Sequence, residues 1–480
     1  MSERLRHATL LLMMCLHACS TDADGGVELS REALLDPESC RGCHPAHYRE
    51  WASSMHAYAS RDPVFRAMNR RGQRETGGEL GGFCVDCHAP MAVRENATRD
   101  GLDLDAVPAH LQGVTCYFCH NAMAVGDHWN NDVELANDRV MRASLKAPQP
   151  TLAHGSAYSR LHDRNLGDST LLCGSCHDVV TPSGVQLERT FAEYKGSVFA
   201  TSARGFETCT GCHMDARETG AGDGRVRHEH LWAGVDVALE DFPDRAVQRA
   251  AIECALSQHA RIGSIEHDGF GGFTVAFETD AGHAQPSGAA QDRRLWLELI
   301  AYARDGRVIF SSGDIADDEL EEKAPDAPGH DRNLMLLRDR IYDAAGEPTH
   351  MFWEAAPSQK HPDGYRSLLL PPMTEGMTAH SLVAKYQVGS PADIARVTAR
   401  LRMRPMGLDV LQDLVASGDL DPALLAEVPT FTLHGAAVEW TPESPTLRPL
   451  WPDALECPQA YVCLLDPRAR GCGDEPRRAP

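Results

Sequence analysis

The residues with the clearest chemical potential are cysteines that recur in pairs. Five times along the 480-residue chain, two cysteines stand two residues apart and a histidine directly follows the second. In chain order these segments are CRGCH at 40–44, CVDCH at 84–88, CYFCH at 116–120, CGSCH at 173–177 and CTGCH at 209–213. Even one such segment is rare in a chain of this composition, so five copies indicate one repeated chemistry.

The C-x-x-C-H spacing is the signature of c-type haem attachment. Two thiols on a short turn form thioethers with the two vinyl groups of one haem, and the adjacent imidazole reaches the iron as proximal ligand. We therefore predict five covalently attached haem c groups. The predicted thioether residues are Cys40, Cys43, Cys84, Cys87, Cys116, Cys119, Cys173, Cys176, Cys209 and Cys212. The predicted proximal iron ligands are His44, His88, His120, His177 and His213.

Two other cysteine chemistries fit less well. A structural zinc site needs four protein ligands, which commonly come from two C-x-x-C-like segments. Zinc binding would not explain why a histidine directly follows each second cysteine. A thioredoxin-like redox pair would occur once, beside a βαβ pattern. Both alternatives leave the fivefold repetition unexplained.

A haem iron held by one histidine has a second axial face, and a second imidazole there gives a six-coordinate centre suited to electron transfer. Eight further histidines lie between the N-terminal apolar run and residue 232: His47, His56, His110, His128, His154, His162, His228 and His230. His47 follows His44 by three residues, on the same short turn. We therefore expect that it does not reach the opposite face of its own haem.

The segment CRGCHPAHYREWASSMHAYAS resembles the first haem motif of multihaem cytochromes related to the tetrahaem carrier of nitrifying bacteria and to hydroxylamine oxidoreductase. The phrases GVTCYFCHNA, LLCGSCHDVVTPSGVQLERTFAEY and CTGCHM also resemble that group, so the likeness covers residues 35–235. It implies that His56, His154, His162 and His230 are distal iron ligands. His110 and His128 stay open.

The pattern changes to strands after a predicted helix at 238–263. GGFTVAFETD, RRLWLELIAYARDGRVIFSSGD, HSLVAKYQVG and ARVTARLRMRP carry the alternation of half-buried strands, with RDG as a hairpin turn. The stretch AGHAQPSG resembles a motif of β-domains fused to multihaem cytochromes, which makes His283 a further candidate distal ligand. A histidine that only shapes a turn is the alternative.

The predicted fold class is α+β: a mainly helical and loop multihaem cytochrome c domain followed by an antiparallel β-sandwich-like domain. The predicted organisation is a signal peptide (1–19), a linker (20–34), a pentahaem domain (35–264), a β-sandwich-like domain with a helical extension (265–440) and a cysteine-containing tail (441–480).

The N-terminus carries basic residues before an apolar run, which is typical of an export signal and is too short to span a bilayer as a mature helix. The letters LHAC resemble a lipobox, although His17 is unusual there, so we expect Cys19 to carry acyl chains and to anchor the protein to the outer membrane. Simple secretion without a lipid anchor is the alternative. Four cysteines lie beyond these segments and the five haem motifs, and in an exported protein they suggest disulfides with three possible pairings: Cys254, Cys457, Cys463 and Cys472.

The formal net charge of −23 argues against nucleic acid as a partner, because phosphate binding needs a basic face. We expect an electron carrier with redox-protein partners in a respiratory or extracellular chain. Two alternatives remain: an oxidoreductase acting on a small nitrogen or sulfur compound, and a structural subunit of a surface conductive assembly. An enzyme would leave at least one haem without a distal protein ligand.

Overall fold

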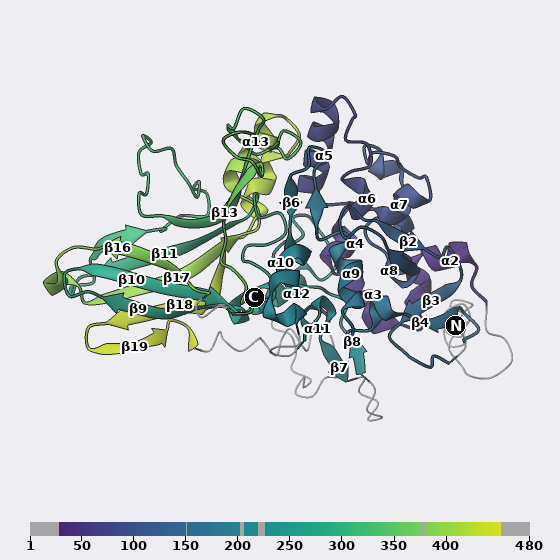
Figure 1. Cartoon of the computed structure of the whole chain (residues 1–480), viewed down its shortest axis with the longest axis horizontal. Helices are drawn as coiled ribbons and strands as arrows, with labels where there is room; N and C mark the ends of the chain where they lie inside the picture. The colour runs from purple at the N-terminus through teal and green to yellow at the C-terminus, as the bar shows by residue number, and fades with distance from the viewer. Residues whose placement is uncertain (1–27, 150, 202–205, 219–225, 377–379, 453–480) are drawn as a thin grey trace, which may run out of the picture. The chain divides into compact units, whose positions relative to one another are not determined.

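The computed structural model describes residues 28–149, 151–201, 206–218, 226–376 and 380–452 (Figure 1). The chain divides into two compact units. The first unit takes residues up to 61, 81–176 and 207–232, and the second takes 62–80, 177–206 and 233 onward. This division differs from the predicted domain boundary at residue 264, because three segments inside the predicted haem region (62–80, 177–206 and 233–264) belong to the second unit. Cys19, Cys457, Cys463 and Cys472 lie outside the described residues.

The first unit consists of short helices joined by long connections. Its helices are α2 (Arg31–Leu35), α3 (Pro45–Ala52), α4 (Met55–Tyr58), α6 (Val85–His88), α7 (Pro90–Arg94), α8 (Cys116–His120), α9 (Asp168–Gly174) and α11 (Cys209–His213). Its 3-10 turns are η1 (Pro37–Cys40), η2 (Leu104–Ala106), η3 (Ala109–Leu111) and η4 (Arg160–His162). Helices of four to eight residues are marginal in water by themselves, so they depend on what they pack against.

Three small strand pairs complete the first unit. β1 (Ala122–Val125) pairs with β2 (Val133–Leu135), and β7 (Ala216–Glu218) pairs with β8 (Val226–His228), both antiparallel. β3 (Val140–Ala143) and β4 (Gly155–Tyr158) run parallel. These pairs fix the connections that leave the cysteine-bearing helices.

The second unit contains two sheets of antiparallel strands (Figure 1). The smaller sheet has the order β16 (Leu382–Gln387), β10 (Gly272–Thr279), β9 (Ala260–His267). The larger sheet has the order β14 (Pro348–Thr349), β13 (Met335–Tyr342), β11 (Arg294–Tyr302), β17 (Arg396–Arg404), β18 (Phe431–Thr441), β19 (Ser444–Pro449). β12 (Val308–Ser312) pairs with β11, and β15 (Tyr365–Leu368) pairs with β13.

Burial along the strands follows the two-residue period of the sequence. In β10 and β17 buried positions alternate with partly exposed ones, whereas β11, in the middle of the larger sheet, is buried on both faces. Side chains from both sheets form one hydrophobic core that includes Val275, Phe277, Leu297, Leu401 and Trp440. The predicted α+β fold and the predicted strands are confirmed.

Helices and a small strand pair complete the second unit. They are α5 (Pro63–Glu75), β5 (Val179–Val180), β6 (Gln186–Glu188), α10 (Thr190–Gly196), η5 (Val198–Ala200), α12 (Arg245–Gln258), η6 (Pro391–Asp393), α13 (Leu408–Ala416) and η7 (Pro422–Glu427). The helix expected within 238–263 is observed as α12, which covers only Arg245–Gln258. α5 is fastened to the loop after α13 by an ion pair of 2.6 Å between Arg74 and Asp419.

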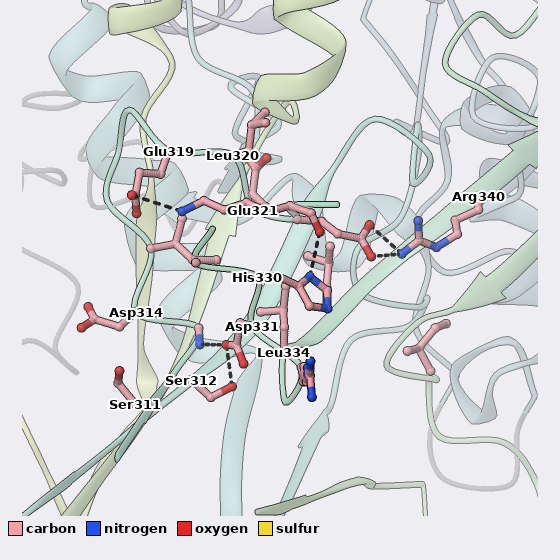
Figure 2. A pocket seen from close by; sticks show the side chains of 18 residues that line it. Ser311, Ser312, Asp314, Glu319, Leu320, Glu321, His330, Asp331, Leu334 and Arg340 are labelled. Atoms are coloured by element: carbon pink, nitrogen blue, oxygen red, sulfur yellow. Dashed lines mark hydrogen bonds and ion pairs between the residues drawn. The ribbon is translucent and has the colours of Figure 1, made fainter. Parts of the chain in front are cut away.

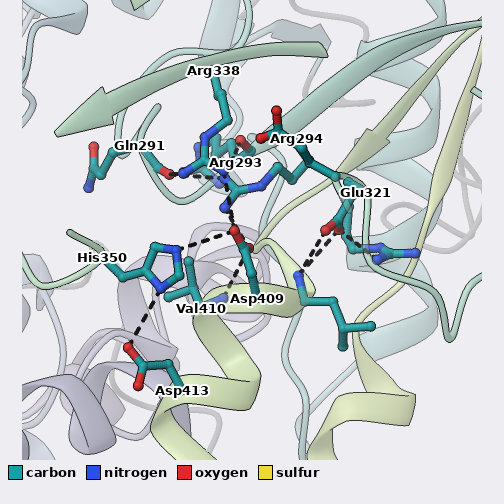
Figure 3. A network of polar contacts seen from close by, with 12 residues as sticks. Gln291, Arg293, Arg294, Glu321, Arg338, His350, Asp409, Val410 and Asp413 are labelled. Atoms are coloured by element: carbon teal, nitrogen blue, oxygen red, sulfur yellow. Dashed lines mark hydrogen bonds and ion pairs between the residues drawn. The ribbon is translucent and has the colours of Figure 1, made fainter. Parts of the chain in front are cut away.

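A partly buried charge network attaches α13 to the larger sheet (Figure 3). Asp409, in the first turn of α13, accepts hydrogen bonds from Arg294 of β11 at 2.6 Å and from Arg338 of β13 at 3.2 Å. Nε2 of His350 lies 3.3 Å from the same carboxylate, and Nδ1 lies 3.6 Å from Asp413. These contacts join one helix to two strands.

Among the residues that the structure describes, no helix is both long enough and apolar enough to cross a membrane.

Candidate functional site

Three of the five cysteine–histidine segments lie on short helices; of the other two, the first segment begins at the end of η1 with Cys40 and the fourth segment begins in the last turn of α9 with Cys173. α8 and α11 each run from the first cysteine of a segment to its histidine, and α6 ends on His88. Residues at i, i+3 and i+4 share one face of a helix. Both thiols and the imidazole of such a segment therefore project from one side, as attachment of a single flat macrocycle requires.

Seven described histidines, five of them predicted iron ligands, have Nδ1 within hydrogen-bond distance of a backbone carbonyl; the other two are His228 and His330. For the five predicted ligands the pairs are His88 with Ala59 (3.1 Å), His120 with Arg142 (2.6 Å), His154 with Gly155 (2.8 Å), His230 with His228 (2.8 Å) and His283 with Ala284 (2.9 Å). A carbonyl can only accept, so Nδ1 carries the proton in all five; in His120, His154 and His230 this leaves Nε2 as the nitrogen that could ligate a metal. Two of the five residues are predicted proximal ligands and three are predicted distal ligands.

Two pairs of imidazoles in the first unit have the separation that one shared iron demands. The ring centroids of His44 and His154 lie 6.4 Å apart, and those of His120 and His230 lie 6.3 Å apart. Two imidazoles on opposite faces of one metal, each bound at about 2 Å, have centroids roughly 6 Å apart. Each pair combines a predicted proximal ligand with a predicted distal one.

Burial keeps these imidazoles in the neutral form that binds metals. Desolvation lowers the pKa of His230 to about 3, with smaller contributions from His47 and His120. Desolvation likewise lowers the pKa of His44, of His120 and of His283. Because a protonated imidazole cannot ligate iron, low pKa values favour ligation at neutral pH.

His162, predicted as a distal ligand, is placed differently. Its Nε2 lies 3.0 Å from the carbonyl oxygen of Cys119, so that nitrogen is the donor and is not directed to a metal. Its ring centroid is 5.3 Å from that of His120, closer than two ligands of one iron would be. Nδ1 of His228 lies 3.0 Å from the Arg164 guanidinium and 3.3 Å from the Met214 carbonyl oxygen, so an arginine competes with the carbonyl for that nitrogen. The geometry therefore favours His154 and His230 over these two neighbours.

The other histidines occupy less decisive positions. His56 lies in α4, and its ring contacts Trp232 edge-on at 4.7 Å. His47 contacts the His230 ring edge-on at 4.8 Å, and burial lowers its pKa to about 4. His110 lies in η3, and His128 lies in the connection between β1 and β2. The His47 ring centroid also lies 5.9 Å from that of His44, but the two residues are three positions apart on the same short turn.

The remaining predicted ligands are divided between the two units. His213 is the last residue of α11 in the first unit, and His177 is the first residue of a segment in the second. His283 lies in a loop of the second unit that Glu193 of α10 holds, because Glu193 accepts from the Ala284 N–H at 3.1 Å and from the Ser287 hydroxyl at 2.6 Å. The segment AGHAQPSG is thus an ordered turn, which is compatible with both readings of His283.

Cysteines from different segments lie side by side within the first unit. Three pairs of thiols hydrogen-bond to one another: Cys40 with Cys116, Cys87 with Cys176, and Cys173 with Cys209. Cys119 is also close enough to Cys173 and Cys176 for their charges to raise its pKa, although burial raises it more. The fourth segment is thereby adjacent to the second, third and fifth, and the first is adjacent to the third.

Two described cysteines, Cys43 and Cys254, are disulfide-bonded. For Cys254 this agrees with the disulfide role expected outside the haem motifs. For Cys43 it conflicts with the predicted thioether, because both bonds use the same sulfur. Haem attachment at Cys43 therefore requires that this disulfide be absent from the haem-loaded protein.

Two charged residues beside the histidine pairs were missed by sequence reasoning. Glu50 of α3 is completely buried, contacts Arg227 and accepts a hydrogen bond from the backbone N–H of His230 at 3.1 Å. The two partners of this ion pair are 177 residues apart in sequence. No local pattern could have brought them together.

The second unit contains a cavity of about 370 Å³ beside β12 and β13 (Figure 2). Its charged side chains are largely engaged with one another: Glu322 with Arg340 at 2.7 Å, and Glu319 with Lys323 at 3.3 Å. Asp331 accepts from the Ser312 hydroxyl at 2.8 Å and from the Gly313 N–H at 2.7 Å. The histidine pairs of the first unit therefore remain the better candidate for chemistry.

Comparison with known proteins gives two matches. Residues 39–121 match the sequence model of the family described as cytochrome c554 and c-prime. The chain is similar to multihaem c-type cytochromes. Its fold matches the crystal structure of a penta-heme cytochrome c552 from Thermochromatium tepidum with a TM-score of 0.57 and 20% sequence identity, over 85% of this chain and 98% of that one. No curated protein matches the sequence.

Proposed function

We propose that this chain is a pentahaem c-type cytochrome that carries electrons along a chain of haems. The observation that carries the proposal is the pair of imidazole separations, 6.4 Å for His44 and His154 and 6.3 Å for His120 and His230. Each pair would hold one iron between two neutral histidines. The haem supplies one-electron redox chemistry, and the protein supplies two axial ligands and a buried environment that tune its potential.

The supply of distal ligands bears on the choice between carrier and enzyme. His154 and His230 are already paired, and His56 and His283 are the best remaining candidates. Without His162 as a distal ligand, the five proposed irons have only four favoured distal histidines. This shortfall of one ligand favours, as a second candidate function, an oxidoreductase in which one open haem binds a small nitrogen or sulfur compound.

Spin state separates the two proposals. For a carrier we expect the intact mass of the mature protein to exceed the polypeptide mass by five haems. Its ferric electron paramagnetic resonance spectrum should contain only low-spin signals, and the protein should not turn over nitrite or hydroxylamine. A high-spin signal equal to one haem in five, together with steady consumption of either compound, would establish the enzyme instead. An excess of four haems would show that one segment, most simply the one containing Cys43, does not carry haem.

The proposed location follows from the N-terminal sequence and from the chemistry of maturation. We infer that the protein is exported, is periplasmic or at the cell surface, and is held to the outer membrane by acyl chains on Cys19, a residue outside the described part of the chain. Its partners would be redox proteins that donate and accept electrons. A structural role in a surface conductive assembly would instead predict concentration-dependent self-association, which sedimentation at several protein concentrations measures.

A further inference from the structure

Helix α3 links the first cysteine–histidine segment to the ligand proposed for the third. The helix begins directly after His44, and Glu50 lies six residues further along it. The Glu50 side chain is completely buried. One of its carboxylate oxygens pairs with Arg227, and the other accepts the backbone N–H of His230 at 3.1 Å.

These contacts fix His230 from two sides. Glu50 holds its backbone, and the carbonyl of His228, at the end of β8, holds its ring through Nδ1 at 2.8 Å. Arg227 belongs to the same strand, and its side chain is only 12% exposed, so the ion pair attaches β8 to α3. The direction of Nε2 of His230 therefore depends on where α3 lies.

Stability alone explains this buried ion pair poorly. Removing two charges from water is costly, and replacing a buried pair with apolar residues is often neutral or stabilising. A carboxylate near a haem has a second effect, because net charge and hydrogen bonding around an axial ligand shift the reduction potential. Glu50 is placed to act on both the orientation of His230 and the charge around it.

We propose that Glu50, held by Arg227, is a positioning residue that fixes His230 as an axial ligand and lowers the reduction potential of the haem that His230 binds. This inference rests on the proposed function, since it requires a haem between His120 and His230. Glu50 does not touch the iron and acts only through the ligand.

The test compares Glu50→Gln with a matched surface variant. Glutamine keeps the shape and an acceptor oxygen for the His230 N–H, but it leaves Arg227 without a countercharge. We expect five low-spin haems and an upward shift in the potential of one of them in a spectroelectrochemical titration. Glu38→Gln is the control, because Glu38 also forms a salt bridge near the first segment, with Arg41 at 2.7 Å, but is half exposed. Its charge is screened by solvent, so the five potentials should not change.

A second variant, Glu50→Ala, removes the acceptor as well as the charge. We expect one low-spin signal to shift or to convert to high spin, because the backbone of His230 loses its anchor. If Glu50→Gln loads five haems with potentials equal to those of the wild type, the inference is wrong. A lowered unfolding temperature with unchanged potentials and spectra in both variants would show a purely structural ion pair and would also overturn it. A wild-type protein without five low-spin haems would instead overturn the proposed function, so the two failures are distinguishable.

Discussion

A histidine can be a distal iron ligand of the kind proposed only if its Nε2 lone pair is not used in another hydrogen bond. His154 and His162 lie eight residues apart in sequence, and both belong to the set that family resemblance favours. His154 uses Nδ1 for a backbone carbonyl, whereas His162 uses Nε2. The two residues therefore differ in which lone pair they can offer, although sequence reasoning treats them alike.

Substitution of these two histidines gives a direct test. We expect His154→Ala to convert one of the five haems to high spin, because the iron bound by His44 would lose its second imidazole. His162→Ala should keep the wild-type spin distribution, with at most a loss of stability from the cavity of about 2 kcal/mol or less. Electron paramagnetic resonance and the haem-to-protein ratio measure both. The opposite result, with His162→Ala producing the high-spin haem, would reverse the ligand assignment.

At the scale of elements, the position of α13 depends on the protonation of one histidine. A hydrogen bond to Asp409 raises the pKa of His350 above its usual value, opposed by burial. Burial would raise the pKa of Asp409, but His350, Arg294 and Arg338 together hold it well below its usual range. The helix is thus attached to the sheet most firmly when His350 is charged.

The pH dependence of the second unit follows from this contact. Because the pKa of His350 is higher in the folded than in the unfolded state, its contribution is complete below about pH 6.5 and is lost as pH rises through the folded value. We expect the free energy of unfolding to fall by up to about 1 kcal/mol between pH 6 and pH 8, since the side chain is one-third exposed and solvent screens the pair. Denaturant unfolding followed by far-ultraviolet circular dichroism measures this change. His350→Gln should remove most of this slope, whereas His434→Gln in β18 should retain it.

The elements also show what the sequence could predict. The short helices at the cysteine–histidine segments and the strands β10, β11 and β17 follow from spacing and alternation, which are local properties. The assignment of residues 62–80 and 177–206 to the second unit does not follow from local sequence properties. It depends on contacts such as Arg74 with Asp419, and the Ser183 hydroxyl with the Ala355 carbonyl, whose partners are 345 and 172 residues apart. In the same way, the family resemblance could suggest His154 and His230 as distal ligands. Only the ring separations in the structure indicate which proximal histidine each of them is paired with.

At the scale of the molecule, the contacts among the five segments form a branched network. The fourth segment is adjacent to the second, third and fifth, whereas the fifth is adjacent only to the fourth among the contacts described above. With a haem on each segment, electrons passing between the first and the fifth would go through the third and the fourth. The fourth segment is therefore the junction of the chain.

Removing one haem at a time tests this arrangement. We expect Cys173→Ser/Cys176→Ser and Cys209→Ser/Cys212→Ser each to lose one haem by intact mass. The first variant should also be destabilised more than the second, by roughly 3 kcal/mol or more, because its haem would contact several neighbours. Thermal unfolding compares the two at equal haem count. Equal unfolding temperatures would contradict a central position for the fourth segment.

The neighbouring thiols also have a consequence for biosynthesis. In the folded chain Cys40 lies against Cys116, Cys87 against Cys176, and Cys173 against Cys209, while Cys43 is disulfide-bonded. In an oxidising compartment, cysteines as near to each other as these would form disulfide bonds. Their sulfurs would then no longer be available to react with the vinyl groups of haem. If the five segments carry haem as proposed, the order of events during maturation is constrained: haem would have to be joined to each segment while the chain is still extended, before compaction brings the segments together.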